Sequence, residues 1–243
     1  MKTFRVNEIF YSLQGEGRNT GRAAVFVRFA GCNLRCPFCD TEFDTFREMT
    51  AEEIVAEIKK LSAPSGDSSL FTLHSSLLVV LTGGEPTLQV DEAFVDLLHQ
   101  HGYEVAMESN GTRPAPHNLD WLTVSPKESP RGTRKEERGT RSEERGTSKE
   151  VRGTRLPDEL KVVFDENTDP ETYLLPPSLQ SKAAEPSASF LLPRENPPFL
   201  YLQPCDTGDA ARNAYIINRC VDYIKAHPQW RLSLQTHKLI DIK

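Results

Sequence analysis

The chain has 243 residues and a formal net charge of −6 at pH 7, so it is long enough for one domain with a sizeable core, which we place at residues 1–243. The acidic balance argues against a nucleic-acid-binding surface, and no apolar stretch is long enough for a membrane span or a secretory signal. Only five cysteines in a chain of this length argue against a disulfide framework, and we expect a reduced, cytoplasmic location.

Short apolar runs alternate along the chain with stretches of helical periodicity. The runs of strand type lie at 25–30, 77–81, 104–107, 121–124, 160–164 and 199–202. Helices are predicted at 50–61, which opens with a Thr50–Glu53 capping box, and at 91–101 and 209–227. This alternation predicts an α/β fold with a parallel sheet. About six strands with few helices predict an incomplete TIM-type barrel, with functional groups at the carboxyl ends of its strands.

Three segments interrupt this pattern. Arg-Gly-Thr recurs every seven residues within 128–156, and residues 131–155 carry nine Lys/Arg and five Glu. Each unit contains a glycine and lacks the apolar positions of a coiled coil, so we predict a disordered low-complexity insertion. Binding of an anionic partner such as RNA is the alternative. Residues 183–198, rich in Pro, Ser and Glu, and residues 62–76, rich in Ser, are predicted to be flexible loops.

Three cysteines follow the first strong strand with the spacing C-x3-C-x2-C, at Cys32, Cys36 and Cys39. Three thiolates on one loop can hold three irons of a [4Fe–4S] cluster and leave the fourth open, whereas a closed cluster takes four cysteines. The alternative is a structural zinc site, but zinc normally takes four ligands, and no nearby histidine or second cysteine pair completes such a set. The spacing therefore favours an iron–sulfur cluster with an open coordination position.

Other polar groups stand where predicted strands end. Gly-Gly-Glu-Pro at 83–86 allows close approach of a ligand to the backbone and offers a carboxylate to an ammonium group, although an ordinary turn explains it equally well. Ser-Pro-Lys at 125–127 and Leu-Gln-Pro at 202–204 could be simple Pro turns. Arg28 interrupts an apolar strand, so it is either paired or faces a cavity, where it could hold a carboxylate.

The cysteine loop together with Gly-Gly-Glu-Pro resembles the radical S-adenosylmethionine (SAM) enzymes. The runs 7–17 (NEIFYSLQGEG) and 26–36 (FVRFAGCNLRC) narrow this resemblance to the 7-carboxy-7-deazaguanine synthase family, and it continues at 108–112, 160–161 and 234–238. It implies a partial barrel of the radical SAM type and conversion of 6-carboxy-5,6,7,8-tetrahydropterin to 7-carboxy-7-deazaguanine with loss of ammonia, in queuosine and 7-deazapurine biosynthesis. One electron from the cluster would cleave SAM to a 5′-deoxyadenosyl radical, which would take a hydrogen from C6 of the pterin.

The resemblance also implies roles for individual residues. The metal ligands would be Cys32, Cys36 and Cys39 for the cluster and Thr41 for a Mg²⁺ ion. The pterin would contact Leu13, Gln14, Gly15, Thr82 and, through its carboxylate, Arg28. The SAM site would be lined by Phe38, Cys39, Asp40, Gly84, Ser125, Pro126, Lys127 and Gln203. Further pocket groups would be Glu108 and His237, whereas we assign no role to Lys243, because the chain does not end in the family's terminal proline.

The implied partners are a flavodoxin or ferredoxin as electron donor and a second copy of the chain in a homodimer, with no membrane and no direct nucleic-acid contact. The closest enzyme alternative is a glycyl-radical activating enzyme, which shares the cysteine spacing but usually has Asp-Gly-Pro-Gly where this chain has Gln-Gly-Glu-Gly at 14–17. The alternative of another class is a zinc-binding interaction module that uses the basic repeat as an RNA-binding arm.

Overall fold

The computed structural model describes residues 2–36, 39, 45–63, 76–127, 155–174 and 197–243. Most of the predicted insertion at 128–156, and of the predicted loops at 183–198 and 62–76, lies outside the described residues. The same is true of three predicted site residues: Phe38, Asp40 and Thr41.

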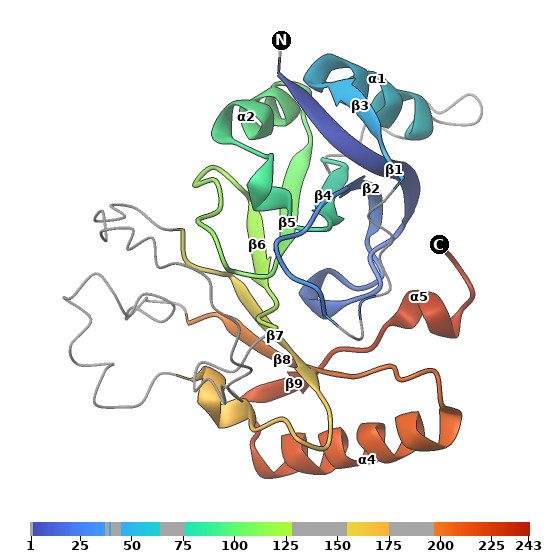
Figure 1. Cartoon of the computed structure of the whole chain (residues 1–243), viewed down its shortest axis with the longest axis vertical. Helices are drawn as coiled ribbons and strands as arrows, with labels where there is room; N and C mark the ends of the chain where they lie inside the picture. Colours follow the sequence, from blue (N-terminus) through green and yellow to red (C-terminus); the bar gives the residue numbers. More distant parts are fainter. Residues whose placement is uncertain (1, 37–38, 40–44, 64–75, 128–154, 175–196) are drawn as a thin grey trace, which may run out of the picture.

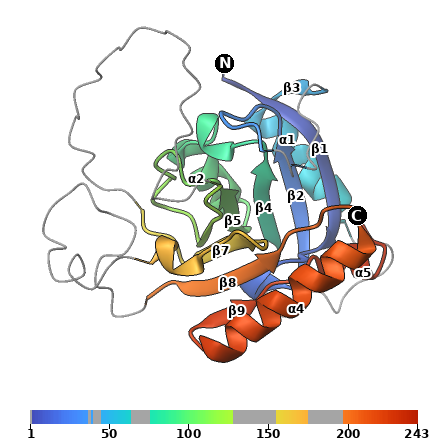
Figure 2. The same ribbon diagram turned by 60° about the horizontal axis from the view of Figure 1, so that its bottom comes forward.

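A nine-stranded sheet runs through the described part of the chain in the order β3-β1-β2-β4-β5-β6-β7-β8-β9. Its parallel strands are β2 (Ala23–Phe29), β4 (Leu78–Gly83), β5 (Glu104–Ser109), β6 (Trp121–Val124), β7 (Glu159–Phe164), β8 (Phe199–Pro204) and β9 (Trp230–Leu232). At the β2 edge, β1 (Thr3–Leu13) and β3 (Arg47–Thr50) are antiparallel. The sheet is strongly curved (Figures 1 and 2). Its outermost strands β3 and β9 do not pair with each other, so the barrel stays open. The predicted incomplete barrel and its six strands are confirmed; β1, β3 and β9 were not predicted.

The helices are α1 (Ala51–Leu61), α2 (Glu92–Gln100), α4 (Ala210–Ala226) and the short α5 (Thr236–Leu239), with 3-10 turns at Gly17–Asn19, Pro86–Leu88 and Pro170–Tyr173. The predicted capping box is present at α1: the Thr50 side chain accepts from the Glu53 N–H at 3.2 Å, and Glu53 Oε2 accepts from the Thr50 N–H at 2.7 Å. The three predicted helices are confirmed, and α5 was not predicted. Among the described residues, no helix has the length and apolar character needed to cross a bilayer.

Alternate residues of the strands serve two different surfaces. In β2, Val25, Val27 and Phe29 are fully buried in the main core, together with residues of α1 and α2. Each such side chain contributes about 1.5–3 kcal/mol of burial free energy. Their neighbours Phe26 and Arg28 point to the other side, into the concave interior of the half-barrel. This alternation explains why a charge interrupts the apolar sequence of β2.

Candidate active site

A cavity of about 430 Å³ lies at the carboxyl ends of the parallel strands. The predicted site residues that line it are Leu13, Gln14, Gly15, Arg28, Cys32, Cys36, Cys39, Thr82, Gly84, Glu108, Ser125, Lys127, Gln203 and His237. Pro126 is described but does not line the cavity. Residues more than 200 positions apart in the sequence therefore share one site, because parallel strands end at the same rim of the sheet.

The cysteine loop forms one wall of this cavity. Cys32, Cys36 and Cys39 are all free thiols that line it, and the Cys39 N–H donates to the Cys36 carbonyl at 3.1 Å. Cys32 Sγ accepts from the Leu34 N–H at 3.4 Å and from Asn110 Nδ2 at 3.8 Å. Donors aimed at sulfur are what a metal-bound thiolate requires. The residues fit a three-thiolate cluster, although no three Cys, His, Asp or Glu side chains in the described residues stand close enough for a preformed metal site.

Two glycines bring this loop against the end of β4. The Gly84 N–H donates to the Phe29 carbonyl at 2.8 Å, and the Glu85 N–H donates to the Gly31 carbonyl at 2.9 Å. A Cβ on Gly84 would lie 1.9 Å from the Gly31 oxygen, and Gly83 has a φ of +109°. Only glycine permits this approach, so the Gly-Gly sequence serves to place the cysteine loop.

The carboxylate of the same motif does not face the cavity. Glu85 is fully buried; its Oε1 accepts from Thr87 and from Ser109 Oγ, and its Oε2 accepts from the Asn110 N–H at 2.7 Å. The interpretation of this side chain as an acceptor for a ligand ammonium is therefore wrong for this conformation. Its oxygens are occupied in tying the loop after β4 to the loop after β5, which carries Asn110 to the cysteines.

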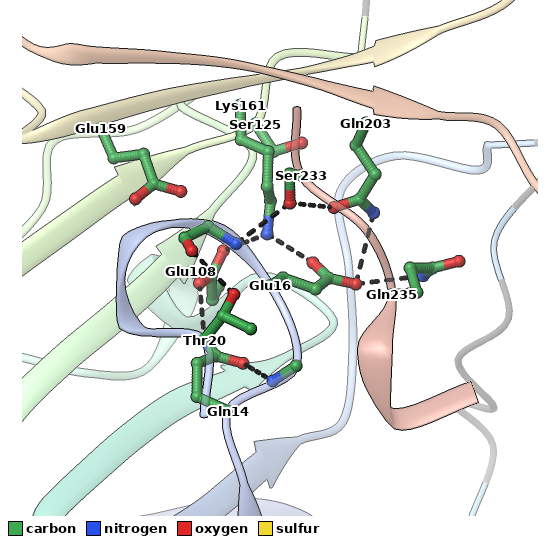
Figure 3. A network of polar contacts seen from close by, with 12 residues as sticks. Gln14, Glu16, Thr20, Glu108, Ser125, Glu159, Lys161, Gln203, Ser233 and Gln235 are labelled. Carbon is green, nitrogen blue, oxygen red and sulfur yellow. Dashed lines mark hydrogen bonds and ion pairs between the residues drawn. The ribbon is translucent and has the colours of Figure 1, made fainter. Parts of the chain in front are cut away.

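The same cavity is also lined by a network of buried charged and polar side chains (Figure 3). Lys161 on β7 donates to Glu16 Oε2 at 2.5 Å and to Glu108 Oε2 at 3.0 Å. Glu16 also accepts from Gln203 at 3.3 Å and from Gln235 at 3.0 Å. The turn after β1, the three strands β5, β7 and β8 and the segment before α5 are thus held by one network of ion pairs and hydrogen bonds.

The network determines which of its carboxylates are ionised. Burial would raise the pKa of Glu16, but the Lys161 ammonium outweighs it and lowers that pKa to about 2. Burial raises the pKa of Glu108 above its ordinary value; Lys161 opposes this shift and the Glu16 carboxylate adds to it. Burial, with repulsion from Lys161, lowers the pKa of Lys127. Of the two carboxyls that Lys161 contacts, Glu108 therefore holds a proton more readily.

A further carboxyl, Glu159, lies at the start of β7. Its Oε2 accepts from the Arg18 N–H at 2.9 Å. Burial, with the Glu108 carboxylate adding to it, raises the pKa of Glu159 to about 7 from the ordinary value of 4.5. Between those two pH values the folded chain holds a proton that the unfolded chain has lost, so this group makes stability fall as the pH rises from about 4.5 to about 7.

We expect the Glu159→Gln variant to keep the Arg18 contact and to remove this titration. Its melting temperature should match that of the wild-type protein near pH 4, below the unfolded-state pKa, and exceed it near pH 8, because the wild-type carboxyl is ionised there at a buried position. Thermal unfolding at both pH values measures the effect. An identical pH dependence in the two proteins would show that Glu159 titrates normally.

Arg28 faces the cavity with donor capacity to spare. Its Nε lies 3.3 Å from Glu8 Oε1 in an ion pair, yet makes no hydrogen bond within the described residues, and its guanidinium lies 5.6 Å from the centre of the Phe10 ring. Lys243, for which the sequence predicts no role, forms an ion pair with the other Glu8 oxygen and also lines the cavity. A guanidinium so placed can receive a carboxylate from a ligand.

The sequence-based site did not include Glu16, Glu159 or Lys161. Lys161 interrupts the apolar strand β7 as Arg28 interrupts β2, and Glu159 is the first residue of β7, so the run 159–164 carried the same signal at Lys161. Glu16 lies inside the Gln-Gly-Glu-Gly motif at 14–17 but has no such signal. Only the fold brings it to Lys161, which is 145 residues away.

Comparison with known proteins relates this geometry to a family. The model of the Radical SAM superfamily matches residues 26–147. A 7-carboxy-7-deazaguanine synthase of Bacteroides thetaiotaomicron is 41% identical over 98% of each chain, and one of Bradyrhizobium diazoefficiens is 38% identical over 99% of this chain and 100% of its own. The chain belongs to the 7-carboxy-7-deazaguanine synthase family. A crystal structure of QueE from Escherichia coli is 25% identical and superimposes with a TM-score of 0.59, covering 96% of this chain and 93% of that one.

Membership of the radical SAM superfamily implies a [4Fe–4S] cluster and SAM as cofactors. The donor set described above fits the first of them. Neither the zinc-binding module nor the glycyl-radical activating enzyme agrees with relatives that match over nearly the full length of this chain.

Proposed function

We propose that the protein is a radical SAM enzyme that converts 6-carboxy-5,6,7,8-tetrahydropterin to 7-carboxy-7-deazaguanine and ammonia, a step of queuosine and 7-deazapurine biosynthesis. One observation carries the proposal. In a member of this synthase family, the three-cysteine loop and a partly unsatisfied arginine, Arg28, line the same cavity. The cavity thus offers an anion site for the substrate next to the thiols that would hold the cluster.

On the pterin side, Arg28 binds the substrate carboxylate while Glu8 holds the guanidinium in place. The remaining pterin contacts are Leu13, Gln14, Gly15 and Thr82 on the adjoining wall. Glu108 and His237 complete this side of the pocket. Loss of ammonia requires a proton for the leaving amine, and Glu108, with its raised pKa, can hold one beside the cavity.

On the cofactor side, Cys32, Cys36 and Cys39 hold the cluster. The proposed SAM site comprises Phe38, Cys39, Asp40, Gly84, Ser125, Lys127 and Gln203, together with Pro126, which links Ser125 to Lys127 but does not itself line the cavity. When bound, cluster and SAM supply the radical that starts the reaction, and the protein contributes orientation and exclusion of water. The half-buried Lys127 donates to Ser125 Oγ at 2.8 Å, which orders the strand end that would face SAM.

Four finer points belong to the proposal. Thr41 would offer its hydroxyl to a Mg²⁺ ion, which prefers six oxygen ligands and would help to hold the substrate carboxylate. A flavodoxin or ferredoxin reduces the cluster, and the chain forms a homodimer. A cytoplasmic location suits an oxygen-sensitive cluster and agrees with the free thiols of all five cysteines.

The proposed function is tested anaerobically. The protein is reconstituted with iron and sulfide, reduced, and supplied with SAM, Mg²⁺ and 6-carboxy-5,6,7,8-tetrahydropterin, and 7-carboxy-7-deazaguanine is sought by mass spectrometry. Formation of that product supports the reaction and the substrate together. If 5′-deoxyadenosine forms without it, the substrate assignment is wrong; if neither forms on an intact cluster, the enzyme assignment is wrong.

Replacing Arg28 by methionine should weaken pterin binding. A lost charge-assisted pair costs about 1.5–3 kcal/mol, which corresponds to roughly 10–100-fold in affinity. SAM cleavage in the absence of pterin should persist, because Arg28 contacts none of the cysteines. Equilibrium dialysis with the pterin measures the affinity.

Arg22→Met is the matched control. Arg22 makes a two-armed pair with Glu104, at 2.9 and 2.6 Å, and does not line the cavity. It should bind the pterin as the wild-type protein does. Unchanged affinity in Arg28→Met would remove Arg28 from the substrate site.

A further inference from the structure

Lys161 is the most enclosed cation of the cavity wall. Its side chain is 5% exposed, and both of its ion-pair partners are carboxylates, Glu16 and Glu108. An ammonium group has three hydrogens in tetrahedral directions. Two of them are directed to these oxygens, at 2.5 and 3.0 Å. Lys161 therefore joins two side chains that come from different parts of the fold, the turn after β1 and the strand β5.

Glu108 passes this constraint on to Gln14. Glu108 Oε2 accepts from Lys161, and its Oε1 accepts from Gln14 Nε2 at 3.2 Å. Gln14 Oε1 in turn accepts from the Gly15 N–H at 2.9 Å. Gln14 is 7% exposed, and both the nitrogen and the oxygen of its side-chain amide are therefore fixed by hydrogen bonds. Its orientation depends on a carboxylate whose own orientation depends on Lys161.

Glu16 fixes the same turn from the other side. Its Oε2 is held by Lys161, and its Oε1 by the amides of Gln203 and Gln235. The Gly15 carbonyl accepts from both the N–H and the hydroxyl of Thr236, at 3.0 and 2.9 Å. The residues on either side of the Gln14–Gly15 peptide are thus anchored to strands and helices (Figure 3).

We propose that Lys161 is a positioning residue of the reaction, which locks Glu108 and the Gln14–Glu16 turn into one unit and so fixes the wall that the pterin contacts. The inference rests on the proposed function and extends it to a residue to which no role was assigned. Lys161 lines the cavity, and the role proposed for it is to hold Glu108 and, through Glu108, Gln14. Without its ammonium, two carboxylates would face each other across a buried gap, and the turn would move away from Glu108.

The test compares two variants that share a background. The single variant Glu16→Gln removes one carboxylate and keeps the Lys161–Glu108 pair. The double variant Glu16→Gln, Lys161→Met also removes the ammonium, and because Glu16 is already neutral, no repulsion between Glu16 and Glu108 arises. Each is assayed anaerobically for 5′-deoxyadenosine and for 7-carboxy-7-deazaguanine, and its pterin affinity is measured by equilibrium dialysis. The ratio of the two products is independent of how much enzyme is folded.

We expect the double variant to form 7-carboxy-7-deazaguanine about 100-fold more slowly than Glu16→Gln, with at least about a tenfold lower yield per 5′-deoxyadenosine and weaker pterin binding. Equal rates, product ratios and affinities within about threefold would overturn the inference and leave Lys161 as a neutraliser of charge. Lys2→Met is the control, because Lys2 pairs with Asp91 at 2.5 Å on the exposed surface. A wild-type protein that makes no product would contradict the proposed function instead.

Discussion

We expect the Cys36→Ala variant to form no detectable 5′-deoxyadenosine and no 7-carboxy-7-deazaguanine. Cys36 is the middle of three thiols on one wall of the cavity, and its carbonyl accepts from the Cys39 N–H. Two remaining thiolates cannot hold three irons of the cluster. The measurement is iron and sulfide per chain after anaerobic reconstitution, about four of each in the wild-type protein and far fewer in the variant.

The control for this prediction is Cys220→Ala. Cys220 lies on the buried face of α4, where burial raises the pKa of its thiol to about 12 and leaves it unreactive. The variant should lose about 1 kcal/mol of stability to a small cavity and keep its cluster. A Cys36→Ala protein with full iron content and turnover would disprove the cluster assignment, and one zinc with no sulfide in the wild-type protein would favour a structural metal site.

The fold was predictable where a strand or helix carries its own signal. The apolar runs of β2 and β4 to β8 are buried on both faces, as parallel strands are, and the Thr50–Glu53 capping box marks the start of α1. The strand β1 lies between β3 and β2 and is antiparallel to both, mixes buried and exposed residues, and contains a register shift between Val6 and Glu8. The three residues of β9 and four of α5 are too short to show a period.

Individual site residues were predictable from the sequence, whereas the contacts between them were not. The glycines at 83–84 and the cysteine spacing indicate a ligand loop, and Arg28 indicates a cavity. Only the fold shows that Glu85 is already occupied by Ser109 and Asn110. The pairing of Glu16 with Lys161 depends on how far the sheet curves, which no local pattern encodes.

The Gly84→Ala variant should keep all three cysteine ligands but displace the loop that carries them. The added Cβ would lie 1.9 Å from the Gly31 oxygen and 3.2 Å from the Cys32 nitrogen, and both are backbone atoms that no rotamer change can move. The loop must therefore separate from β4, which breaks the hydrogen bonds that Gly84 and Glu85 donate to Phe29 and Gly31.

We expect Gly84→Ala to lose about 1–3 kcal/mol of stability, as overpacked sites do, and to form 5′-deoxyadenosine about 100-fold more slowly because the thiols are displaced by about an ångström or more. Thermal unfolding, iron content and 5′-deoxyadenosine formation measure the effects separately. Gly102→Ala is the matched control: Gly102 has a φ of +79° with open space around it, so the substitution strains the backbone without a collision. If both variants lose stability and only Gly84→Ala loses SAM cleavage, the close approach of β4 positions the cluster loop; wild-type SAM cleavage in Gly84→Ala would show that the loop tolerates the displacement.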